Sequence, residues 1–193
     1  MNEALPSSLP AADLAVLGHQ VFCDDEIPVG WSAVQALPDD HELARMNARN
    51  EVVLRTLALV EEHDETHTED AERAEMHRVE AKVNLVLELL ADLVAAQHGA
   101  LPARWVRFNS RGICWEADEP LPPDTLLRVV CYAAAAWPVP LKLHVRVASS
   151  DPGGAGFRIC ARIEGLSAGA ANWLEKLVFR RHRRAVAQSR AAR

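Results

Sequence analysis

The sequence predicts an α+β chain in which a long coiled-coil helix precedes a small antiparallel β-barrel that ends in a C-terminal helix. Three observations predict this class: residues 39–98 contain neither Gly nor Pro, residues 103–165 alternate apolar and polar side chains, and the chain end returns to a helical period. We therefore divide the chain into an N-terminal arm (1–38), a long heptad-bearing helix (39–98) and a barrel with its C-terminal helix (99–193).

Composition and charge are those of a globular chain. Of the 193 residues, 49% are hydrophobic and 25% are charged, and the net charge is −6. Because the chain has no overall basic character, we do not expect nucleic-acid binding. The N-terminus lacks a signal-peptide pattern, and no apolar run approaches the ~18 residues of a membrane span. We expect a cytoplasmic protein with no membrane span.

The four cysteines are widely spaced and include no C-x-x-C pair, which disfavours a zinc or redox motif. We expect free, buried thiols in a reducing compartment. The residues are Cys23, Cys114, Cys131 and Cys160.

The N-terminal arm, residues 1–38, is punctuated by prolines. Its segment "VFCDDEIPVGW" has an extended, turn-broken pattern. We expect a short arm that packs on another part of the protein.

Residues 39–98 carry the start and stop signals of a helix. Asp39 and Glu42 have the spacing of a capping box, and Gly99 and Pro102 follow the segment. A single helix of this length would extend roughly 90 Å at 1.5 Å per residue, which is typical of a coiled coil.

Heptad spacing within this helix predicts a homo-oligomer, with a tetramer favoured over a dimer because Val occupies both core positions. Asn50 at a core position would fix the register. The heptads before and after the acidic stretch 61–75 lie on different faces, so the alternatives are one continuous helix, a break near Thr66, or a hairpin within one monomer. The predicted interface residues are Val53, Leu57, Val60, Met76, Val79, Val83, Val86, Leu90 and Leu93.

Residues 103–165 have the period of two that is typical of strands. We expect five short strands in a barrel-like arrangement, with "DPGG" at 151–154 as a hairpin and "EPLPPDT" at 119–125 as a turn-rich connection. Strands and helices do not alternate, so a doubly wound nucleotide-binding fold is not expected. The final helix follows Ser167, which is a suitable N-cap.

Enzymatic motifs are weak. The segment "HDETH" places His63 and His67 one helical turn apart, as in zinc hydrolases, but Asp64 follows His63 and no third ligand is evident. A metal-dependent hydrolase is therefore an alternative to a solvated acidic helix face. No nucleophile motif or P-loop is present, and we expect no enzyme and no bound metal.

Two polar segments are candidate ligand sites. In "RFNSRG", residues 107–112, backbone amides at a tight turn are able to hold a phosphate, or the turn joins two strands. The cluster "RRHRR" at 180–184 suits an anionic ligand or an acidic partner, or it is a solvated helix end.

The segment "FRICARIEGLSAGAANWLEKLVFRRHRR", together with "WVRFNSRGICWEADEPLPPDTLLRV", resembles the PilZ family. The long heptad helix and the "DEIPVGW" arm make the chain similar to the atypical, helix-extended branch of that family. The resemblance implies a small β-barrel related to receptors for cyclic di-GMP, whose ligand-binding members carry R-x-x-x-R before the barrel and [D/N]-x-S-x-x-G after its first strand.

This chain departs from both motifs. Aligning Gly112 with the motif Gly places Arg107 at the acid or amide position and Asn109 at the Ser position. "RMNAR" at 45–49 fits the arginine motif in letters but lies in the expected helix. We therefore expect "RFNSRG" to be a strand-linking turn.

The resemblance predicts a non-enzymatic regulatory or adaptor module in cyclic di-GMP-linked bacterial signalling, with a signalling protein as its partner. We expect no tightly bound cofactor, cyclic di-GMP included. The alternative is a direct receptor that uses non-standard residues, which would be Arg107, Asn109, Ser110, Arg111, Gly112, Arg180 and Arg184.

Overall fold

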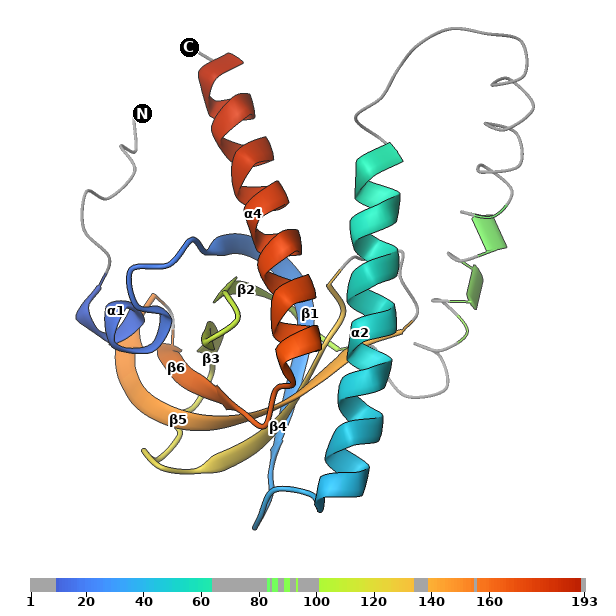
Figure 1. Ribbon diagram of the computed structural model, residues 1–193. Coiled ribbons are helices and arrows are strands. Elements are labelled where there is room, and N and C mark those ends of the chain that lie inside the picture. The colour runs from blue at the N-terminus through green and yellow to red at the C-terminus, as the bar shows by residue number, and fades with distance from the viewer. Residues whose placement is uncertain are drawn as a thin grey trace, which may run out of the picture.

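The computed structural model describes residues 10–63, 101–133, 139–154 and 156–191, together with six helical positions between 83 and 93. At its centre is a closed barrel of antiparallel strands, with one short helix on the outside and two long helices beside it (Figure 1). The predicted combination of a small antiparallel barrel, a C-terminal helix and a preceding helix is confirmed.

The strands follow the order β1-β2-β3-β6-β5-β4 around the barrel. The hairpin predicted at "DPGG" joins β5 to β6, and the "EPLPPDT" turn joins β3 to β4. The strands are β1 (Cys23–Ala33), β2 (Ala103–Phe108), β3 (Gly112–Ala117), β4 (Leu126–Cys131), β5 (Leu141–Gly153) and β6 (Gly156–Glu164), and the described helices are α1 (Ala11–Leu17), α2 (Asp40–His63) and α4 (Ala168–Ala191).

The barrel has six strands where we expected five, because the N-terminal arm supplies β1. The first half of β1 pairs with β2, beginning with Cys23 opposite Phe108, and the second half pairs with β4, beginning with Val29 opposite Cys131. The arm therefore closes the barrel. Three consecutive acids and Pro28 conceal this strand in the sequence, since both residue types are depleted in strands.

Alternate residues of the strands fill the barrel interior. On β5 the predicted alternation is confirmed, since Leu141, Leu143, Val145 and Val147 are all buried. Among the described residues, Trp115 of β3 is the largest of the fully buried side chains. Full burial of one large apolar side chain contributes about 1.5–3 kcal/mol, so this interior is the main source of stability.

The helix α2 buries one face against the barrel and α4. Val53 and Leu57, which we assigned to an oligomer interface, are only 4% and 3% exposed and belong to the core of this chain. That assignment was wrong because heptad spacing identifies an apolar face but not the chain that covers it. The side chain of Val60, the residues Met76 and Val79, and the predicted break near Thr66 lie outside the described residues.

Two asparagines of α2 bind the backbone of the barrel. Asn50 donates to the Lys142 carbonyl at 2.7 Å and accepts from the Lys142 N–H at 3.1 Å. Asn47 donates to the Gly165 carbonyl at 2.8 Å and accepts from the Ser167 N–H at 3.1 Å. The predicted role of Asn50 in an oligomer register is therefore wrong, because its amide is used within the chain.

Both predicted helix caps are present. The Asp39 carboxylate accepts the Glu42 N–H at 2.8 Å at the start of α2, and the Ser167 hydroxyl accepts the Ala170 N–H at 3.1 Å at the start of α4. The two helices run side by side in the same direction (Figure 1). Ser167 also donates to Glu51 of α2 at 2.8 Å, so the cap links the two helices.

Two of the four cysteines form a disulfide, which corrects our expectation of free thiols throughout. Cys114 of β3 and Cys160 of β6 are opposite each other in register and are bonded. They are 46 residues apart in the sequence, so spacing alone does not reveal the pair. Cys23 and Cys131 are buried, as expected, and burial raises the pKa of Cys131 to about 12.

Candidate functional site

The "RFNSRG" segment forms the hairpin turn between β2 and β3, as we expected. The Asn109 N–H donates to the Gly112 carbonyl at 3.0 Å, and the Asn109 side-chain oxygen accepts the N–H groups of Arg111 at 2.8 Å and Gly112 at 3.2 Å. A Cβ atom at Gly112 would overlap Val16 and lie 2.8 Å from the Ala161 carbonyl oxygen, so the close approach requires Gly. The turn amides bind the Asn109 side chain and are not presented to a ligand.

The same turn is tied to two helices. The Asn109 amide donates to the Leu17 carbonyl of α1 at 2.9 Å, and the Ser110 hydroxyl donates to Glu175 of α4 at 2.7 Å. Two of the polar side chains that we considered for nucleotide binding therefore have structural partners.

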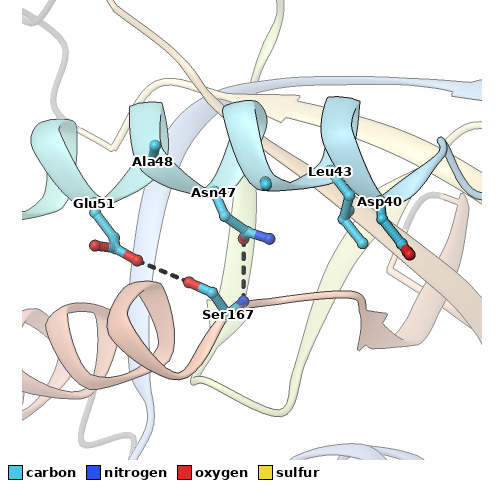
Figure 2. A pocket seen from close by; sticks show the side chains of 7 residues that line it. Asp40, Leu43, Asn47, Ala48, Glu51 and Ser167 are labelled. Carbon is cyan, nitrogen blue, oxygen red and sulfur yellow. Dashed lines mark hydrogen bonds between the residues drawn. The ribbon is translucent and has the colours of Figure 1, made fainter.

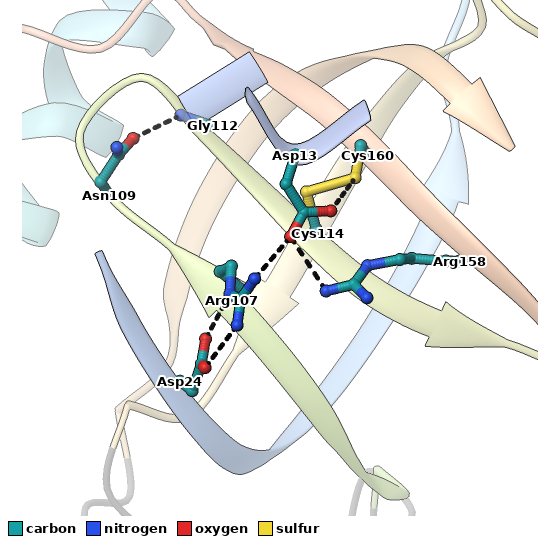
Figure 3. The surroundings of a disulfide bond; sticks show 8 residues. All are labelled: Asp13, Asp24, Arg107, Asn109, Gly112, Cys114, Arg158 and Cys160. Atoms are coloured by element: carbon teal, nitrogen blue, oxygen red, sulfur yellow. Dashed lines mark hydrogen bonds and ion pairs between the residues drawn. A yellow bond between two sulfur atoms is a disulfide. The ribbon is translucent and has the colours of Figure 1, made fainter. Parts of the chain in front are cut away.

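Arg107 is the centre of an ion-pair network on the outside of the barrel (Figure 3). It forms two bonds of 2.6 Å with the Asp24 carboxylate and a third, of 2.8 Å, with Asp13. Its guanidinium lies 4.5 Å from the ring centre of Phe22 and 5.3 Å from that of Trp105. The hydrogen bonds to Asp24, followed by those to Asp13, raise the pKa of Arg107 above its ordinary value.

Asp13 of α1 completes this network from above. It has no exposed surface, and it also accepts a bond of 2.9 Å from Arg158 of β6. Arg158 lies over Trp105 at 4.3 Å from the ring centre. The Sγ atom of Cys160 lies 3.5 Å from the other carboxylate oxygen, so the network rests on the disulfide (Figure 3).

Sequence reasoning missed Asp13, Asp24 and Arg158 as partners of Arg107. Each is far from Arg107 in the chain, and β-strand register brings Asp24 opposite it. The pairing of Asp24 with Arg107 gave no local signal, because alternation failed to identify the strand that contains Asp24. The remaining contacts depend on where α1 packs.

The other predicted ligand residues do not share one site with Arg107. Arg111 is exposed in the turn. Arg180 donates to the Ala58 carbonyl of α2, and Arg184 lies one turn farther along α4. Within the same basic cluster, Arg181 binds Asp25 of β1 at 2.8 Å and the Ala133 carbonyl at 2.6 Å. This part of the cluster joins α4 to the barrel and to α2.

A groove of about 350 Å³ lies between α2 and the start of α4 (Figure 2). Asp40, Asn47, Glu51 and Ser167 supply its polar groups, and the hydrogen bonds that link the helices already engage the last three. The groove therefore has the features of a helix junction.

The second candidate site is apolar. Val83, Val86, Leu90 and Leu93, which we predicted at an oligomer interface, are helical and between 44% and 54% exposed. Leu85 and Leu89 are exposed as well. On α2, Val52 and Leu59 are 55% and 56% exposed and lie seven residues apart on the face opposite the buried one. So much exposed aliphatic surface is typical of an interface with another chain.

None of the described helices has the length and apolar character that a membrane span requires. Among the described residues, Asp13, Cys114 and Cys160 are the only acid, His or Cys cluster close enough to hold a metal, and two of these are disulfide-bonded. His67 of the hydrolase alternative lies outside the described residues.

Comparisons with known proteins agree on one family. The sequence profile described as "Atypical PilZ domain, cyclic di-GMP receptor" matches residues 54–191. A solved structure of a pathogenic protein from Xanthomonas campestris is described as a tetrameric PilZ domain self-assembled via an unusual helical bundle. It is 30% identical to this chain, with a TM-score of 0.70, and the match covers 95% of this chain and 99% of that one. No curated protein matches the chain.

Proposed function

The chain belongs to the atypical PilZ family, and from this we propose that it is a regulatory module of cyclic di-GMP signalling that acts through protein contacts and catalyses no reaction. We place this action in the bacterial cytoplasm and expect the partner to be another signalling protein.

The hydrogen bonds that Arg107 already forms are the main support for our proposal about cyclic di-GMP binding. A guanidinium that binds a phosphate needs free N–H groups for a bidentate contact. Three bonds to Asp13 and Asp24 engage Arg107, and its side chain is only 10% exposed. The neighbouring Asn109 and Ser110 are bound to α1 and α4. We therefore propose that cyclic di-GMP binds weakly or not at all to the isolated protein.

Calorimetric titration with cyclic di-GMP tests this proposal. Each missing charge-assisted bond removes about 1.5–3 kcal/mol. We expect a dissociation constant weaker than about 100 µM, which corresponds to a binding free energy of about −5.5 kcal/mol.

A direct receptor is the second candidate, because the family description names a receptor and because Arg111 is exposed in the turn. In this case the titration gives low-micromolar binding that Arg111→Ala abolishes. Arg55→Ala is the matched control, since Arg55 is exposed on α2. Tight binding that is lost in Arg111→Ala and kept in Arg55→Ala would overturn our first proposal.

We also propose that the module is a homo-oligomer, with a tetramer favoured over a dimer. The exposed apolar residues between 83 and 93 support it, together with the tetrameric helical bundle described for the Xanthomonas campestris protein. Val83, Val86, Leu90 and Leu93 would face the other chains.

A further inference from the structure

The Cys114–Cys160 disulfide lies between the outer surface of the barrel and α1. On β3, Ile113 and Trp115 belong to the barrel core, whereas Cys114 packs with Val16 and Leu17 of α1. Both cysteines are 0% exposed. A reagent can therefore reach this disulfide only after α1 moves away from the barrel.

The helix α1 depends on this contact for its position. It has seven residues and no side-chain hydrogen bond at its N-cap, so it is too short to be stable alone. What holds it is the buried Asp13, bound by Arg107 and Arg158, and the burial of Val16 and Leu17. Local opening of such an element requires far less than global unfolding.

The charged groups around the disulfide balance one another. Asp13 and Asp24 supply two carboxylates, and Arg107 and Arg158 supply two guanidiniums. Reduction places two thiols where Cys160 Sγ already lies 3.5 Å from Asp13. A thiol placed there adds a hydrogen atom beside a carboxylate that Arg107 and Arg158 already bind.

Space acts in the same direction. Two unbonded sulfur atoms need more room than the ~2.05 Å separation of a disulfide, and packed interiors hold little spare volume. The element that can move is α1, because β3 and β6 are held together by their backbone pairing at the cysteines.

We propose that Cys114 and Cys160 are a reversible thiol–disulfide site, whose oxidised form holds α1 against the barrel and whose reduced form releases it. The co-reactant is a dithiol. One of its thiolates attacks a sulfur of the pair to form a mixed disulfide, and its second thiol then displaces the protein thiol. The protein disulfide gains two electrons and two protons, and the dithiol becomes a disulfide.

Coupling between two such events is reciprocal, so loosening α1 must make the disulfide easier to reduce. The chain offers a matched pair of variants for this test. Leu17 is 0% exposed beneath α1, whereas Leu14 is 37% exposed on the same helix. Leu17→Ala loosens the helix without changing any charge, and Leu14→Ala is the control.

The first experiment measures the rate at which dithiothreitol reduces the intact protein, by alkylating free thiols and weighing the peptides that contain Cys114 and Cys160. We expect reduction roughly tenfold faster in Leu17→Ala, within the usual range of coupling strengths, and a near-wild-type rate in Leu14→Ala. Circular dichroism confirms that the variants are folded. Equal rates in folded Leu14→Ala and Leu17→Ala would overturn the proposal.

The second experiment needs no change to α1. Hydrogen exchange of the amides in residues 11–18 is measured for oxidised and reduced wild-type protein, with Cys114→Ala as a form that cannot respond to the dithiol. We expect exchange in these amides to be at least roughly fivefold faster after reduction in the wild type alone. Equal protection of α1 in the oxidised and reduced wild type would sink the idea, even if Leu17→Ala fails to fold.

Discussion

Two arginines of β2 show how burial determines what an ion pair contributes to the stability of the fold. Arg107 and its partner Asp13 are 10% and 0% exposed at their side chains. Arg104 forms a similar bond of 2.6 Å with Asp118, but the Asp118 side chain is 81% exposed. Removing one member of a buried pair leaves an uncompensated charge, whereas water compensates an exposed one.

We expect Arg107→Gln to destabilise the protein by about 3–5 kcal/mol. Arg104→Gln, on the same strand, should cost less than about 1 kcal/mol. Urea unfolding of both variants measures the difference. Similar losses for the two variants would mean that the Arg107 network contributes no more than a surface pair.

His144 gives the fold a pH dependence. It is buried on β5, opposite Arg128 of β4 and Glu164 of β6 in register. Burial and then the positive charge of Arg128 lower the pKa of His144, while Glu42 of α2 opposes them. As pH falls, the unfolded chain binds this proton first, near its ordinary pKa of about 6.5. The folded state therefore loses stability below that pH and is unaffected by His144 above it.

We expect His144→Gln to lose less stability than the wild type when the pH is lowered from about 7.5 to 5. His41→Gln is the control, because His41 is exposed on α2. The free energy of unfolding is measured at both pH values. If the two variants and the wild type lose the same amount, His144 does not carry this dependence.

Helix α2 binds backbone groups at the edge of the barrel through asparagine side chains, in the way that a neighbouring strand would. The pairing of β6 with β5 ends opposite His144, so among the described strands Lys142 pairs with β4 alone, and the Asn50 amide takes the place of the missing neighbour. Asn47 does the same where the chain leaves β6. These four hydrogen bonds fix the position of α2 along its axis and its rotation about that axis, relative to the barrel.

We expect Asn50→Ala to reduce stability by about 1–3 kcal/mol, because it leaves two backbone groups of Lys142 without their partner. Arg49→Ala, at the neighbouring exposed position, should stay within about 0.5 kcal/mol of wild type. Thermal unfolding distinguishes them. A neutral Asn50→Ala would show that water replaces the amide.

The α2 segment also shows what periodicity predicts and what it does not. Its N-terminal cap, its helical character and its apolar stripe are all evident in the sequence from Asp39 to Leu57. The sequence does not say that the stripe through Val53 and Leu57 faces the barrel while Val52 and Leu59 remain exposed. Both faces carry apolar residues at helical spacing, and only the tertiary fold distinguishes them.

For the molecule as a whole, the described positions between 83 and 93 are the surface on which assembly should depend. Val83→Asp places a charge on this surface, and we expect it to dissociate the oligomer while the barrel stays folded. Val21→Asp is the matched control, because Val21 is 42% exposed and precedes β1. Sedimentation equilibrium gives the mass of each variant. A wild-type protein with the mass of one chain would exclude the assembly itself.

Most of the barrel could be predicted because β5 and β6 alternate cleanly and are joined by "DPGG". The candidate site could be predicted only in part. The turn at Asn109 has a local signal, whereas the partners of Arg107 and the bond between Cys114 and Cys160 come from strands that meet through register. Contacts between distant segments leave no spacing to detect in a single sequence.

The position of β1 in the chain has a consequence for biosynthesis. A ribosome completes β1 about 100 residues before β4, which at 5–20 residues per second is a delay on the order of 5–20 seconds. For about three quarters of this delay the nascent strand has neither of its neighbours, because β2 is completed about 75 residues after β1. Asp24, Asp25 and Glu26 keep its first half charged, which discourages pairing with other chains on the same polysome. The same acids that make β1 difficult to recognise as a strand thus also discourage its pairing with other nascent chains until its own partners are synthesised.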